Sequence, residues 1–96
     1  MAHTTSAPTA ALVERIQTGV RIEKRLLKVL KALADSLDIT LGDLLEGIVL
    51  HAFEGKAPFS KRTLKKVAEL RKVFDLDLTA ADAHHMKEKP GVRSAG

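Results

Sequence analysis

The chain has 96 residues and a formal net charge of +4, and it contains no cysteine, tryptophan or tyrosine. This length allows one small domain with a marginal core, and the lack of cysteine excludes disulfides and thiolate-bound metals. Because only three phenylalanines are present, the core must be aliphatic, and we expect oligomerisation to supply part of the stability.

Residues 1–12 are predicted to form a flexible tail, because Thr, Ser, Ala and Pro occur there without apolar periodicity. This stretch lacks the basic and apolar regions of a signal peptide, and no apolar run approaches the 18 residues that cross a membrane. We therefore expect a cytoplasmic protein with no membrane partner.

Residues 15–22 alternate between two kinds of side chain, which predicts a half-buried β-strand. One side carries Arg15, Gln17, Gly19 and Arg21, and the other carries Ile16, Thr18, Val20 and Ile22. No second strand is evident in the chain, and a strand alone leaves its backbone N–H and C=O groups unpaired. We therefore expect two copies of the strand to pair in a homodimer.

Helical spacing of apolar residues follows the strand. One helix is expected over about 23–37, and a second begins at Thr40, whose hydroxyl and the Asp43 carboxylate form a capping box, and ends near Gly55. A third helix is expected over 60–74, and a short fourth helix is expected to begin at Thr79 and to fray near residue 90. Residues 90–96 are expected to be disordered.

The charge is concentrated in one part of the chain. Residues 55–72 contain a single acid, Glu69, and seven basic residues, namely Lys56, Lys61, Arg62, Lys65, Lys66, Arg71 and Lys72. Most of them fall on one face of the third helix, which suggests a polyanionic partner. A solvated helix face is an equally good interpretation of this cluster taken alone.

The stretch TGVRIEKRLLKVLKALADSLDITLGDLLEGIVLHAF resembles the ribbon-helix-helix fold of the Arc, MetJ and CopG repressors. The resemblance covers residues 15–53 and depends on the order and spacing of the V-R-I strand end, the leucines of the first helix, the DIT turn and the capped second helix. It implies a mainly α fold with one N-terminal β-strand pairing across an intertwined homodimer, plus a C-terminal helical extension. The expected domains are a flexible tail over 1–12, a dimerisation and DNA-binding domain over 13–55, and a basic helical extension over 56–96 with a disordered end.

The resemblance also implies which residues contact DNA. Gln17, Gly19 and Arg21 occupy the alternate strand positions whose side chains contact bases in this family, and Arg15 lies one step before them. Arg and Gln pair bidentately with guanine and adenine edges in the major groove, which a two-stranded ribbon fits. Thr40, Leu41 and Gly42 match the start of the second helix, where backbone N–H groups bind a DNA phosphate.

Lys61, Lys65 and Lys72 share one face of the third helix and are candidates for additional phosphate contacts. We thus expect a sequence-specific, double-stranded DNA-binding transcriptional regulator, a prokaryotic repressor of its own gene that inserts a two-stranded β-ribbon into the major groove. Such a regulator is expected to associate with the nucleoid, and assembly beyond the dimer on tandem half-sites stays open. One alternative is an antitoxin, whose C-terminal extension binds a toxin partner protein, and another is a dimeric scaffold that never touches DNA.

Enzymatic and metal-binding functions are not expected. The chain offers no Ser/His/Asp arrangement, no paired carboxylates and no glycine-rich phosphate loop. His84 and His85 are adjacent, so on a helix they diverge by about 100° and do not share a face. His51 alone is better explained as a surface residue or as one that packs against a partner than as a metal ligand. We expect no catalytic residue, no cofactor and no metal.

Overall fold

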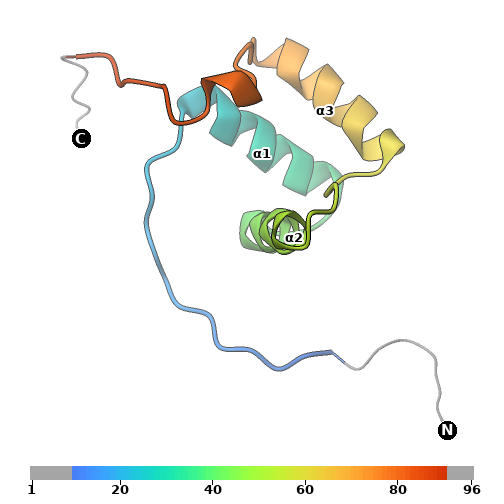
Figure 1. The fold of residues 1–96 in the computed structure, drawn as a ribbon. Coiled ribbons are helices and arrows are strands. Elements are labelled where there is room, and N and C mark those ends of the chain that lie inside the picture. The colour runs from blue at the N-terminus through green and yellow to red at the C-terminus, as the bar shows by residue number, and fades with distance from the viewer. Residues whose placement is uncertain (1–9, 91–96) are drawn as a thin grey trace, which may run out of the picture.

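The computed structural model describes residues 10–90, which contain three α-helices and one 3₁₀ turn. The elements are α1 (Lys24–Ser36), α2 (Leu41–Phe53), α3 (Lys61–Val73) and η2 (Ala80–Asp82). Figure 1 shows α1 between α2 and α3, and α1 contacts both of these helices. The expectation of a mainly α protein is confirmed, and each of the three long helices begins within one residue of its predicted start.

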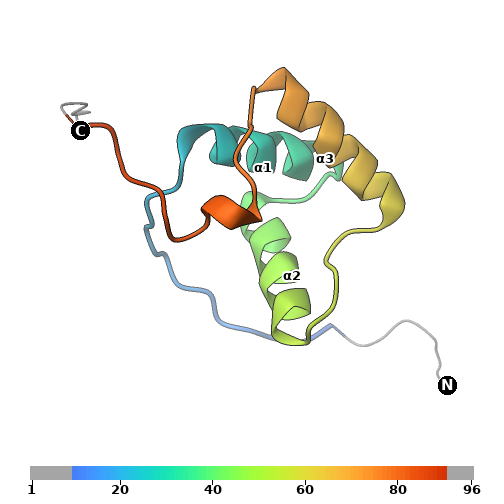
Figure 2. The ribbon, with the colours of Figure 1, turned by 45° about the horizontal axis from the view of Figure 1, so that its top comes forward.

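The predicted ribbon-helix-helix fold is wrong, because no β-strand forms anywhere in residues 10–90. The stretch 15–22, expected to pair across an intertwined homodimer, belongs instead to an arm without regular secondary structure. This arm, residues 10–22, leaves the start of α1 and runs outside the helical body (Figures 1 and 2).

The physical reason is the lack of a partner for the arm's backbone. No backbone hydrogen bond joins the arm to any other described residue, and a ladder requires a neighbouring strand. Alternation of side chains predicts which sides of an extended backbone are polar, but it supplies no second strand.

Each long helix begins with a side chain that accepts a hydrogen bond from one of its first free N–H groups. The Glu23 carboxylate accepts from Leu26 N at 2.8 Å, and the Thr40 hydroxyl accepts from Asp43 N at 3.0 Å. The Ser60 hydroxyl accepts from the N–H three residues later at 3.2 Å. Because the first N–H groups of a helix have no partner within it, these caps fix the three starting points.

Each long helix also ends in the same way, with a residue in the left-handed conformation. These residues are Asp38, Gly55 and Asp75, with φ angles of 59°, 69° and 54°. After α1, Ile39 N donates to Ala34 O at 3.0 Å, and equivalent bonds close the ends of α2 and α3. This is the Schellman arrangement, which satisfies the last carbonyl groups and turns the chain sharply.

The core is small and is shared by all three helices. Leu33 and Ala34 of α1 and Leu44 of α2 are buried in its centre. Packed against them are Leu30, Ile39, Ile48, Phe59, Val67 and Leu70. The stretch predicted as a C-terminal extension therefore contributes side chains to the same core as α1 and α2.

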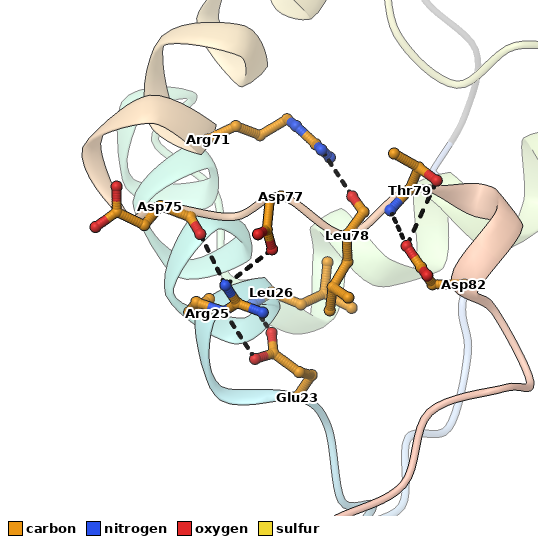
Figure 3. A network of polar contacts seen from close by, with 9 residues as sticks. All are labelled: Glu23, Arg25, Leu26, Arg71, Asp75, Asp77, Leu78, Thr79 and Asp82. Carbon is orange, nitrogen blue, oxygen red and sulfur yellow. Dashed lines mark hydrogen bonds and ion pairs between the residues drawn. The ribbon is translucent and has the colours of Figure 1, made fainter.

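After α3 the chain returns to the start of α1, as Figure 3 shows. Residues 75–90 are called the C-terminal segment below. Its Leu76 is 5% exposed, and Arg71 donates to the Leu78 carbonyl at 2.7 Å. Arg25 of α1 donates to the Asp75 carbonyl at 2.9 Å and to the Asp77 carboxylate at 3.0 Å. The beginning of this segment is thus bound to both α1 and α3.

The fourth predicted helix is only the single turn η2. A capping box closes its start, since Thr79 N donates to the Asp82 carboxylate at 2.8 Å and Ala81 N donates to the Thr79 hydroxyl at 3.3 Å. Tail residues 1–9 and terminal residues 91–96, for which flexibility was predicted, lie outside the described residues. Within 10–90, none of the helices has the length and apolar character needed to span a membrane.

Candidate nucleic-acid interface

The four residues predicted to contact bases all lie exposed on the arm. Arg15, Gln17, Gly19 and Arg21 follow one another along it with one residue between each pair, and none of them belongs to the core. A Cβ atom placed on Gly19 would meet nothing within 4 Å. No packing requirement of this chain therefore explains a glycine at that position.

Arg15 is held by a carboxylate from α2. Its Nε and Nη2 atoms donate to the two oxygens of Glu46, both at 2.8 Å. This fork of two parallel bonds is the strong geometry for an arginine and a carboxylate. Hydrogen bonding to Arg15 lowers the pKa of Glu46, and the same bond raises the pKa of Arg15. Arg15 is therefore charged and oriented toward α2.

Arg21 is held in the same manner by a carboxylate from the C-terminal segment. Its Nε atom donates to Glu88 at 3.2 Å, and its Nη2 atom pairs with the other oxygen of the same carboxylate. Hydrogen bonding to Glu88 raises the pKa of Arg21. Both side chains of this pair are largely exposed, at 82% and 73%, so solvent screens their attraction.

An open groove of about 450 Å³ lies between the arm and α2. Val13 from the arm and Leu45, Val49 and Leu50 from α2 line it, with Glu14, Arg15 and Glu46 at its polar positions. Beyond the groove, Phe53 at the end of α2 is 81% exposed. The arm and the outer side of α2 thus present apolar side chains to solvent beside the Arg15–Glu46 pair.

The predicted phosphate-binding residues begin α2. Thr40 and Gly42 are exposed and Leu41 is half-buried. Within residues 10–90 the Leu41 and Gly42 N–H groups donate no hydrogen bond, and the Thr40 hydroxyl accepts from Asp43 N instead. These two groups are therefore open to an external acceptor, although the Asp43 carboxylate in the same turn adds a negative charge.

The predicted additional phosphate contacts lie on a different helix. Lys61, Lys65 and Lys72 are exposed on α3. No hydrogen bond or ion pair in the described part of the chain joins them to the arm or to the start of α2. The structure therefore brings Arg15 toward α2, but it leaves the lysines of α3 as a separate basic surface.

Sequence reasoning missed the acidic partners. Glu46 and Glu88 lie 31 and 67 positions from the arginines that they bind, and no local pattern marks either residue. Glu23 was expected only as the first residue of a helix, yet it caps α1 and pairs with Arg25 at 3.0 Å. Arg25 binds three acceptors, on Glu23, Asp75 and Asp77, but its sequence position carried no signal beyond its place on α1.

No cluster of three His, Cys, Asp or Glu residues able to hold a metal occurs in residues 10–90. His51 instead makes a contact within its own helix, with Nδ1 2.6 Å from the Gly47 carbonyl oxygen.

Comparison with known proteins adds no assignment, because no protein-family model, no curated protein and no solved structure matches this chain.

Proposed function

We propose that the protein is a homodimeric regulator of transcription that binds double-stranded DNA in a sequence-specific manner and represses its own gene. The observation that carries this proposal is the arm. Its Arg15, Gln17 and Arg21 side chains are exposed and pack into no part of the core. Arginine pairs bidentately with guanine and glutamine with adenine, so these residue types suit base recognition.

Attraction to the phosphate backbone is supported by the charge distribution. The net charge is +4, and the lysines of α3 form a second exposed basic surface. The open N–H groups of Leu41 and Gly42 at the positive end of α2 suit a phosphate oxygen. Such contacts hold DNA without reading its sequence.

A dimer is supported by the apolar side chains that the single chain leaves in water. Val13 and Ile16 on the arm and Val49, Leu50 and Phe53 on α2 are all exposed. Complete burial of one such side chain is worth about 1.5–3 kcal/mol. A second copy of the chain, packed against this surface, would enlarge a core that is small for 96 residues.

The antitoxin alternative differs in the role of α3 and the C-terminal segment. Extensions that capture a toxin are often disordered until they bind. Here Val67 and Leu70 of α3 pack against the core and Leu76 is buried. Because this region is already folded onto α1, we favour the regulator over the antitoxin.

The test is a selection of binding sites from a pool of random DNA duplexes, followed by affinity measurements on the selected and a scrambled sequence. We expect Arg21→Ala and Gln17→Ala to lose about 1–3 kcal/mol of discrimination per lost base contact. A pool that yields no preferred sequence, or variants that discriminate as well as the wild type, would overturn the proposal.

The contribution of α3 is measured by salt dependence. The triple variant Lys61→Ala, Lys65→Ala and Lys72→Ala should keep its sequence preference and lower the slope of log affinity against log salt by about 0.9 per lost phosphate contact. The matched control removes three exposed lysines from α1, namely Lys24, Lys28 and Lys31. Equal slopes for the two triple variants would show that α3 makes no specific phosphate contacts.

A further inference from the structure

Both arginines of the proposed base-contacting arm are engaged by carboxylates that come from distant parts of the chain. Arg15 is engaged by Glu46 of α2, and Arg21 by Glu88 of the C-terminal segment. Each pair uses the Nε and Nη2 atoms of the guanidinium. This edge of the guanidinium is also one that forms two parallel hydrogen bonds with a guanine base or a phosphate group.

Glu88 reaches Arg21 because the fold anchors the segment that carries it. Leu76 is buried, Arg71 donates to the Leu78 carbonyl, and Arg25 donates to the Asp75 carbonyl and the Asp77 carboxylate. Figure 3 shows these contacts beside Glu23, the residue at which the arm meets α1. The C-terminal segment therefore starts from a fixed point close to the root of the arm.

We propose that Glu46 and Glu88 are internal competitors of DNA, so that the protein is autoinhibited and binds DNA by exchanging these carboxylates for base edges. The inference rests on the proposed DNA-binding function. A carboxylate and a base edge cannot occupy the same two donor atoms at once, so each ion pair must open before its arginine contacts a base. Non-specific attraction by the α3 lysines needs no such exchange.

The effect of each competitor is limited by its exposure. Ion pairs between solvent-exposed side chains have small free energies, so opening one lowers the affinity for the selected DNA sequence by about two- to fivefold. Because only the arginine contacts are inhibited, the ion pairs lower the affinity for the selected sequence more than the affinity for non-specific DNA.

The experiment compares three variants that make the same change of charge, Glu46→Gln, Glu88→Gln and Glu54→Gln. Glu54 is the control, because it pairs with Lys56 at 3.0 Å and its removal frees a basic side chain outside the arm. Affinity is measured at one salt concentration on the selected duplex and on its scrambled counterpart. We expect Glu46→Gln and Glu88→Gln to tighten specific binding about two- to fivefold more than Glu54→Gln does.

A second comparison isolates the pair itself. In an Arg21→Ala background, Glu88→Gln should tighten binding no more than Glu54→Gln does, because the arginine that it would release is absent. The autoinhibition would be overturned if, in the wild-type background, Glu46→Gln and Glu88→Gln raised the affinity no more than Glu54→Gln does. It would also be overturned if Glu88→Gln still raised the affinity more than the control in the Arg21→Ala background. Either result would leave the DNA-binding function in place. Failure of every variant to bind any duplex would overturn the proposed function and this inference together.

Discussion

The guanidinium of Arg25, in the first turn of α1, donates a 2.9 Å hydrogen bond to the carbonyl oxygen of Asp75, which lies 50 positions later in the chain. The same side chain binds the carboxylates of Asp77 and Glu23. One arginine thus links the root of the arm, the start of α1 and the residue that ends α3.

Arg25→Ala should lower the melting temperature, because it removes these contacts and leaves the Asp75 carbonyl without its charged donor. Arg25→Lys should lower the melting temperature less, since it keeps the charge but loses the forked geometry. Arg62→Ala, an exposed arginine on α3, is the control and should change it little. Thermal unfolding of the three variants makes the comparison, and equal melting temperatures for Arg25→Ala and Arg62→Ala would contradict the proposed link.

The pKa of Glu23 predicts a pH dependence of stability. Burial raises this pKa, but hydrogen bonds from Leu26 N and Arg25 outweigh the burial and hold it below the ordinary value of 4.5. A carboxyl group whose pKa is lowered by folding stabilises the folded state above its unfolded pKa. This contribution is lost as the pH falls from about 4.5 through the lower pKa of the folded state.

Glu23→Gln should therefore destabilise the protein at pH 7, and the difference from the wild type should shrink at pH values below the folded pKa. Denaturant unfolding of both proteins at several pH values checks this. A difference that stays constant with pH would mean that the charge of Glu23 does not stabilise α1.

The left-handed residues at the helix ends predict stabilising substitutions. Asp38 and Asp75 have φ angles of 59° and 54°, a conformation that costs a non-glycine residue free energy and costs glycine none. Asp38→Gly and Asp75→Gly should each raise the unfolding free energy by up to about 1 kcal/mol. Asp35→Gly makes the same change of charge inside α1 and should lower it, because glycine is a weaker helix former than aspartate. Chemical denaturation of the three variants measures these changes in unfolding free energy. A loss of stability in all three would refute the backbone strain at Asp38 and Asp75.

The proposed dimer predicts an effect of position on self-association. Val49 lines the groove between the arm and α2, whereas Val73 is exposed at the end of α3. Val49→Asp should convert dimers into monomers, since it would bury an unpaired charge at the interface, and Val73→Asp should leave the dimers intact. Sedimentation at micromolar concentrations measures both. A wild-type protein that sediments as a monomer would end the dimer proposal.

The sequence predicted those parts of the fold that depend on interactions between residues close together in the chain. The caps at Thr40 and Ser60 and the glycine at 55 act within a few residues, so the helix starts and the end of α2 were predictable. The prediction of a strand in the arm was wrong because the alternation of Arg15, Ile16 and their neighbours describes a single segment, whereas a β-ladder requires two paired strands.

For the site, the exposure of Arg15, Gln17 and Arg21 does not confirm the alternation, because Ile16 and Val20, expected to be buried on the other side of the strand, are 88% and 74% exposed. The acidic partners of the two arginines could not be predicted, because Glu46 and Glu88 reach the arm only through tertiary contacts across 31 and 67 positions. The same holds for Arg25, whose importance arises from where the chain returns after α3.

The unpaired backbone of the arm has a consequence for how binding can be observed. Amide hydrogens that lack acceptors exchange with solvent at the rate of an unfolded chain, while those around Leu33 and Ala34 exchange only when the molecule opens. Residues 10–22 therefore show little protection of their amides before a partner binds, so any protection that a partner adds is readily detected there. Slowed exchange confined to the arm on adding DNA would locate the contact there, and slowed exchange with increasing protein concentration alone would place the arm between two subunits.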